Sequence, residues 1–283
     1  HHSFLGPTGP TLALPILALQ STPIVGTLHD PVPHKTPHTR RIQTKMWTTK
    51  MKILSRIPDR IFVHGDGCYQ QAKYVGYDMG KIYSIPHGVY DYFKKFDFEK
   101  YDSESNTLLF FGSISDYKGF DRIPEILDIV EKEVEDITAI VAGRPNCNQS
   151  DVIKSLREDS RVELHAKYIP DDQVGEFFTR ASIVVLPYYE ASSSGVLMTS
   201  YAFNKPVVAT DVGDVGQMIA KDNTGLLADP SSTLGIAESI IDILTSDSIS
   251  HRFTQNVIER KDDYAWENIA KQLIDHYQIM IDK

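Results

Sequence analysis

The sequence is poor in cysteine, in long apolar runs and in metal-binding motifs. Only two of its 283 residues are cysteines, Cys68 and Cys147, which excludes a disulfide framework and a cysteine-based zinc site. No apolar run approaches the roughly 20 residues of a membrane-spanning helix, because the longest early candidate, 11–18, is interrupted by Pro15. The histidines form no His-Glu-x-x-His pair. We therefore expect neither a metal site nor a spanning helix.

An excess of positive charge is also missing, because the net charge is −9. Such a molecule repels nucleic acid and anionic membranes unless a local basic patch intervenes, so no nucleic-acid partner is predicted. Hydrophobic residues make up 41% and charged residues 24%, a balance typical of a folded globular protein. The scarcity of cysteine fits a reducing compartment, and we expect a cytoplasmic location.

Short apolar runs alternate with longer amphipathic stretches along the chain. The runs are rich in β-branched and aromatic residues, as buried parallel strands are. Expected strands are 24–28, 60–64, 82–85, 107–112, 137–142, 162–165, 183–186, 206–209 and 224–228. Expected helices are 122–131, 171–180, 195–203, 234–244 and 264–277. Strands that alternate with helices predict an α/β protein with doubly wound parallel sheets.

A polar stretch without a clear period, 91–106, suggests a linker between two domains. We predict a first domain over 1–97, a second over 98–262 and a C-terminal helix over 263–283 that packs back toward the first domain. The first domain contains only about three strands, whereas a doubly wound domain has five or six. The sequence also begins at a histidine, His1, so we expect it to be truncated at its N-terminus.

Two strand-to-helix junctions could carry chemistry. After the strand at 107–112 a polar loop leads to Lys118 and Gly119, where an amine and helix-start amides can bind a phosphate. After the strand at 183–186 comes a turn with three serines and a glycine, 192–195, in front of an apolar helix. Small side chains there would let a pyrophosphate approach the helix N-terminus. A solvated lysine and a simple helix cap explain the same patterns.

Together and in order, these segments resemble the nucleotide-sugar-binding domain of retaining glycosyltransferases of GT-B architecture, in the large family numbered four. Further segments carry the resemblance: 27–30, 85–89, 140–143, 162–165, 169–170, 205–213, 225–227 and the helix of Trp266. The resemblance implies two Rossmann-like domains, the first incomplete. It also implies metal-independent, cofactor-free transfer of a sugar, with retention, from a nucleotide-sugar donor to a glycan or lipid-linked acceptor.

The resemblance assigns roles to residues of this sequence. It places His29 near the reacting sugar, and we add Glu190 as a second catalytic candidate that could accept hydrogen bonds from sugar hydroxyls. The donor-binding candidates are Gly112, Ser113, Lys118, Arg144, Ser194, Gly195, Val196 and Thr199. Ser113 stands where many members have arginine, and Arg144 is the arginine near an equivalent strand end. Ala191 and Thr199 stand where members usually carry two glutamates, so the nucleotide is not predicted.

Alternatives to this function remain open. A catalytically silent nucleotide-sugar-binding subunit fits the missing glutamates, and a nucleotide-sugar epimerase shares the architecture. Separately, the stretch 40–56 contains six basic residues interspersed with apolar ones, and it contains no acidic residue. Such a helix can contact an anionic membrane surface, which would place the protein at the inner face of the membrane. An ordinary surface helix is the other interpretation.

Overall fold

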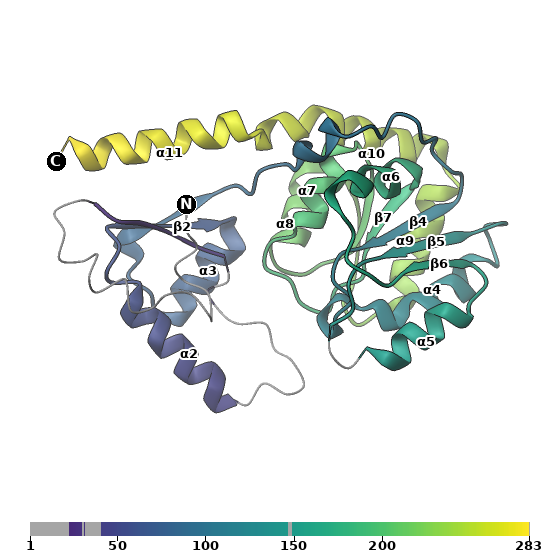
Figure 1. The fold of residues 1–283 in the computed structure, drawn as a ribbon, viewed down its shortest axis with the longest axis horizontal. Coiled ribbons are helices and arrows are strands. Elements are labelled where there is room, and N and C mark those ends of the chain that lie inside the picture. The colour runs from purple at the N-terminus through teal and green to yellow at the C-terminus, as the bar shows by residue number, and fades with distance from the viewer. Residues whose placement is uncertain (1–22, 30, 32–40, 147–148, 283) are drawn as a thin grey trace. The chain divides into compact units, whose positions relative to one another are not determined.

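The computed structural model describes residues 23–29, 31, 41–146 and 149–282, with the side chains of 41–47 left aside. The chain forms two compact units (Figure 1). One comprises residues 1–88 together with 264–283, and the other comprises residues 89–263. Each unit has its own parallel sheet and is described by itself.

The first unit contains a parallel sheet with the strand order β1-β2-β3. Its elements are β1 (Val25–Leu28), α2 (Arg41–Leu54), β2 (Arg60–His64), α3 (Asp66–Val75), the 3₁₀ turn η1 (Met79–Lys81), β3 (Ile82–Ile85) and α11 (Trp266–Ile281). Side chains alternate between the two faces of β2. Ile61 and Val63 pack with α2 and α3, whereas Phe62 packs with Ile269 of α11. The sheet is therefore covered on both faces.

The second unit contains a parallel sheet with the strand order β6-β5-β4-β7-β8-β9. Its strands are β4 (Thr107–Phe111), β5 (Thr138–Ala142), β6 (Val162–His165), β7 (Ile183–Leu186), β8 (Val207–Thr210) and β9 (Gly225–Ala228). Its helices are α4 (Ile123–Val130), α5 (Ser150–Glu158), α6 (Asp171–Arg180), α7 (Gly195–Ala202), α8 (Gly213–Asp222), α9 (Thr233–Leu244) and α10 (Asp247–Arg260). Shorter 3₁₀ turns are η2 (Asp91–Lys95), η3 (Asp116–Lys118), η4 (Phe120–Arg122) and η5 (Lys261–Tyr264), the last of which runs into the first unit.

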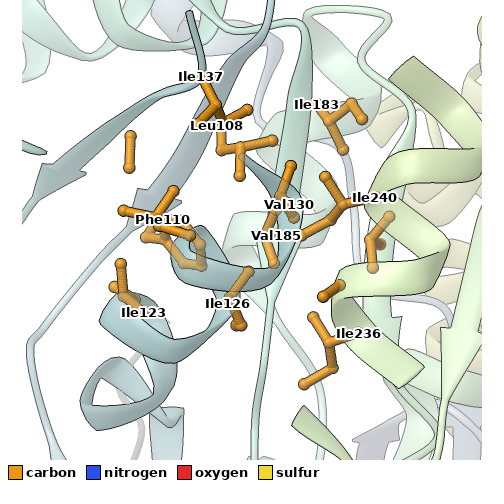
Figure 2. Close-up of a cluster of buried hydrophobic side chains, with 14 of the residues drawn as sticks. Leu108, Phe110, Ile123, Ile126, Val130, Ile137, Ile183, Val185, Ile236 and Ile240 are labelled. Atoms are coloured by element: carbon orange, nitrogen blue, oxygen red, sulfur yellow. The ribbon is translucent and has the colours of Figure 1, made fainter. Parts of the chain in front are cut away.

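The main core of the second unit lies on one face of this sheet. Figure 2 shows Leu108 and Phe110 of β4 and Val185 of β7 near Ile126 of α4 and Ile240 of α9. On the other face, the Phe111 ring of β4 lies 5.1 Å from the Phe178 ring of α6, measured between centroids. Helices thus cover both faces, and the loops at the strand ends remain to form a site.

The predicted fold class is confirmed: the chain is an α/β protein with parallel sheets. Each expected strand overlaps an observed one, and their limits either coincide or differ by a single residue. The expected helix over 122–131 is one residue shorter at each end in the structure, because Arg122 belongs to the 3₁₀ turn η4 and Glu131 is the C-cap of α4.

The domain limits differ from the predicted ones. The first unit ends at Gly88, whereas 97 was expected, and the stretch 91–106 belongs wholly to the second unit. Aromatic contacts explain the difference, because the Tyr90 ring lies against Gly195 and the Phe98 ring lies 5.1 Å from that of Phe203. The segment lacks a sequence period, but its aromatic side chains attach it to the second unit.

Most of the basic stretch 40–56 forms α2, which ends at Leu54; residues 55 and 56 lie in the turn that follows, and residue 40 lies outside the described residues. Met51 and Leu54 are buried in the core of the first unit, which leaves Ile53, 59% exposed, as the large apolar side chain of the last turn that faces solvent. Among the described residues, no helix has the length and apolar character needed to cross a membrane.

Candidate functional site

The strand order of the second sheet reverses between β4 and β7. From β4 the chain steps outward to β5 and β6, and from β7 it steps outward in the opposite direction to β8 and β9. Ligands of doubly wound folds bind outside the carboxyl ends of the strands at such a reversal. The loops at this point follow β4, over 112–119, and β7, over 187–194. These are the two junctions singled out in the sequence.

Backbone contacts hold the two loops together. The Tyr189 amide donates a hydrogen bond of 2.8 Å to the Tyr117 carbonyl. Gly119 has a φ of 69°, and a Cβ at this position would lie 2.0 Å from the Pro187 carbonyl oxygen. No side chain fits there, so Gly119 permits the close approach of the loops.

Lys118 points its amine into the space between these loops. Its side chain is 8% exposed, and its amine has no hydrogen bond or ion pair with any described residue. A Cβ built on Gly112 would lie 2.6 Å from the Lys118 Nζ and 3.4 Å from the Val196 Cγ2. Burial lowers the pKa of Lys118, and Tyr117 acts in the opposite direction. A buried amine without a partner is costly and favours an anionic ligand.

The start of α7 is the other side of the site. Ser194 is the N-cap of this helix, and its hydroxyl accepts a hydrogen bond of 3.3 Å from the Leu197 amide. The amides of Gly195 and Val196 lie in the first turn, where the helix dipole favours negative charge. Since Val196 and Lys118 contact the same point at Gly112, the structure brings the predicted lysine and the predicted helix start together.

The other predicted donor-binding residues surround this group to different degrees. Ser113 is half-buried beside Gly112, and the Arg144 carbonyl accepts a 3.0 Å hydrogen bond from the Ile114 amide while its side chain is exposed. Thr199 is 3% exposed and donates its hydroxyl hydrogen to the Gly195 carbonyl at 2.8 Å. Glu190 is half-buried in the loop after β7. Their roles toward a donor stay predictions.

His29, the remaining predicted residue, belongs to the first unit and follows β1. Its ring lies 5.2 Å from that of His64, which lies 5.0 Å from that of His87, measured between centroids. His64 ends β2 and His87 follows β3, so the three rings line the carboxyl edge of this sheet. We call them the histidine cluster. The Cys68 thiol donates to the His29 carbonyl at 3.4 Å.

Burial disfavours the charged forms of His64 and His87 in this cluster. It lowers the pKa of His64 to about 4, and the neighbouring His87 and His29 add to the effect. Burial also lowers the pKa of His87. The Nδ1 atom of His64 is buried without a hydrogen-bond partner among the described residues. Within that same part of the chain, no three His, Cys, Asp or Glu side chains are placed to hold a metal ion.

Sequence reasoning missed His64, His87 and Tyr188. The first two end or follow strands, and Tyr188 follows Pro187 directly after β7. Their positions at the carboxyl ends of parallel strands, where ligands bind in such folds, could have identified them as site candidates.

Comparison with known proteins assigns the family. The sequence model of the family described as "Glycosyl transferases group 1" matches residues 91–260, more than half of the chain. The chain belongs to this family. The matched range includes Lys118 and the start of α7, and it excludes His29.

Curated relatives agree with this membership. The chain is 24% identical over 189 residues to a D-inositol 3-phosphate glycosyltransferase of Corynebacterium glutamicum, covering 61% of this chain and 43% of the relative. It is 25% identical over 181 residues to an N-acetyl-alpha-D-glucosaminyl L-malate synthase of Bacillus anthracis, covering 62% of this chain and 45% of the relative. The match therefore spans less than half the length of these relatives.

Solved structures show the same fold. A sucrose-phosphate synthase of Thermosynechococcus elongatus aligns with a TM-score of 0.78 at 18% identity, over 96% of this chain and 71% of that one. Anabaena Alr3699/HepE in complex with UDP and glucose aligns with a TM-score of 0.74 at 16% identity, over 95% of this chain and 76% of that one. The expected GT-B architecture of this group 1 family member, with two Rossmann-like domains, is confirmed.

Proposed function

We propose that this chain is part of a metal-independent retaining glycosyltransferase. It would move a sugar from a nucleotide-sugar donor, without a further cofactor, to a glycan or lipid-linked acceptor. The buried amine of Lys118 beside the start of α7, which has no hydrogen bond or ion pair to a described residue, carries the proposal, because this arrangement suits a diphosphate. Family membership and the UDP and glucose bound in the Anabaena neighbour support it.

Lys118 and the α7 amides would act on the leaving group. When the glycosidic bond breaks, negative charge develops on the diphosphate, and fixed donors aimed at that charge lower the barrier. The amine supplies a full positive charge, and the Gly195 and Val196 amides supply oriented dipoles. These donors would do the work that a metal does elsewhere, while His29 contacts the donor sugar and Glu190 accepts hydrogen bonds from its hydroxyls.

The proposal predicts that Lys118→Ala weakens nucleoside diphosphate binding. Calorimetric titration of the chain with UDP, GDP and ADP identifies the base that binds, and Lys118→Ala should weaken that ligand roughly 10- to 100-fold through loss of a charge-assisted contact. Lys154→Ala is the matched control, because the Lys154 side chain is 74% exposed and pairs with Glu158, one turn along α5. An unchanged affinity in Lys118→Ala would overturn the assignment of this residue.

A donor-binding subunit without catalytic activity is the second candidate. Where the family resemblance expects glutamates, the chain has Ala191 and Thr199, and the Thr199 hydroxyl is already bonded to Gly195. Incubation with a nucleotide sugar that binds, followed by mass spectrometry, separates the candidates. Transfer or hydrolysis indicates an enzyme, an epimerised sugar indicates an epimerase, and an unchanged donor indicates the silent subunit.

Contact with an anionic membrane surface through residues 40–56 is a separate proposal, and so is the cytoplasmic location at its inner face. Because Met51 and Leu54 are buried, the contact would depend on exposed Ile53 and Lys50. Flotation with vesicles rich in phosphatidylglycerol should carry the wild type upward and leave Ile53→Asp behind. Equal flotation of the two proteins would contradict the contact.

A further inference from the structure

Tyr188 lies between the two loops of the candidate site. It is 3% exposed, and the Lys118 Nζ lies 5.5 Å from the centroid of its ring. The Tyr117 ring packs edge-on against it at 6.3 Å between centroids. The Thr210 hydroxyl of β8 donates to the Tyr188 carbonyl at 2.5 Å. Contacts from β8 and from the first loop therefore fix both the backbone and the ring.

The hydroxyl of Tyr188 faces the second loop. Burial raises the pKa of Tyr188 to about 12, and the neighbouring Ser194 hydroxyl acts in the opposite direction. This hydroxyl is buried and has no hydrogen bond of normal geometry to any residue that the structure describes. The side chain thus reaches from the Lys118 amine at its ring to the N-cap of α7 at its hydroxyl.

The groups around the Lys118 amine leave its charge largely uncompensated. The neighbours of the amine are Tyr117, which lies on the same turn as Lys118, Gly112 at the end of β4, Val196 on α7 and Tyr188 after β7. No carboxylate in the described parts of the chain pairs with this amine. The face of an aromatic ring attracts a cation, and the attraction is stronger where water is excluded.

We propose that Tyr188 is a positioning residue of the diphosphate site, whose ring holds the Lys118 cation and whose side chain packs against the Ser194 turn. The inference rests on the proposed function, since it takes Lys118 and the start of α7 as the diphosphate-binding groups. Tyr188 would act on the ligand only through these two groups.

The test compares UDP affinity between pH 6.5 and 9.5 in the wild type, Tyr188→Phe and Tyr188→Leu. Loss of the ring face should weaken binding roughly tenfold in Tyr188→Leu. The cationic form of Lys118 is the one that binds, and the ring stabilises that form. Without the ring, the pKa of Lys118 falls, so binding declines at a lower pH as the pH rises. Tyr188→Phe keeps the ring and should keep the wild-type pH profile, with a smaller loss from the missing hydroxyl.

A purely structural role would weaken binding by the same factor at every pH, and that result would overturn the inference. If Tyr188→Leu does not fold, replacement of Tyr188 by a fluorinated phenylalanine keeps the ring close to its size and makes the ring face electron-poor, so the same pH shift is expected. The reactivity of Lys118 toward acetic anhydride, followed by mass spectrometry without ligand, gives an independent readout of its protonation. Absence of UDP binding in the wild type overturns the proposed function, whereas an unshifted Lys118 reactivity in the variants overturns the role of Tyr188.

Discussion

Different functional groups lie at the carboxyl ends of the strands in the two parallel sheets; we call these ends of the sheets their carboxyl edges. In the second unit the edge holds the Lys118 amine beside the start of α7, with the reversal of strand order between β4 and β7 beneath it. In the first unit the same edge holds the histidine cluster, His29, His64 and His87. Both edges are places where doubly wound sheets bind ligands.

Burial shifts the pKa values of ionisable side chains at both carboxyl edges, but the consequences for ligand binding differ. It lowers the pKa of Lys118 and that of His64 alike, because it disfavours the charged form. A lysine starts about four pKa units above a histidine, so it tolerates a larger decrease before it loses its charge at neutral pH. The Lys118 site is thus suited to an anion, whereas the His64 ring is uncharged at neutral pH and can donate or accept hydrogen bonds.

A substitution that separates the two loops beside Lys118 should have the largest effect on stability and ligand binding. In Gly119→Ala a Cβ would overlap the Pro187 carbonyl oxygen, and the positive φ disfavours any side chain. We expect a loss of about 3 kcal/mol in the free energy of unfolding, measured with urea, and loss of UDP binding.

Gly235→Ala is the matched control for this substitution. Gly235 lies in the first turn of α9, and its new Cβ would lie 3.2 Å from the Oγ of Ser232, the N-cap that accepts a hydrogen bond from the Gly235 amide, so a displacement of a few tenths of an ångström relieves the contact. We expect a change within about 1 kcal/mol. Equal effects of the two substitutions would show that the close approach at Gly119 has no special importance.

His64 of the histidine cluster should make the stability of the protein depend on pH. The pKa of His64 is about 4 in the folded state and about 6.5 when unfolded, so the unfolded chain binds more protons between these values. Stability should therefore decrease as the pH falls from about 6.5 to 4, by roughly 3 kcal/mol in total. Urea unfolding followed by circular dichroism across this range measures the slope.

His64→Asn should flatten that slope, because it removes the buried imidazole. His251→Asn serves as the control, since His251 is exposed on α10. A slope that stays as steep in His64→Asn as in the control would assign the acid sensitivity to other groups.

The smallest effect is expected at Thr199, one turn into α7. Thr199→Val removes the hydroxyl that bonds the Gly195 carbonyl and keeps the side-chain volume. We expect a loss of about 1 kcal/mol in stability and less than a threefold change in UDP affinity, because the hydroxyl hydrogen is bonded within the helix. A larger loss of affinity, measured by titration calorimetry, would indicate direct contact with the ligand.

Much of the fold followed from local sequence patterns. Buried parallel strands such as β4 and β7 are continuous apolar runs with a loop at each end, so their positions and the α/β class were predictable. Lys118 and Ser194 were predictable as site candidates because each stands at the end of a strand or the start of a helix. The boundary at Gly88 was not, since it depends on contacts of Tyr90 and Phe98 with distant residues.

The sequence by itself determined which segments become strands and helices, because periodicity and turn residues act over a few positions. Tertiary structure alone decided that Lys118, Gly112 and Val196 meet at one point, and that Tyr188 lies beneath the amine. It also decided that three histidines from separate strand ends come together in one cluster. The physical reason is that strand order and burial bring together residues far apart in the chain, and burial then sets which of them keep a charge.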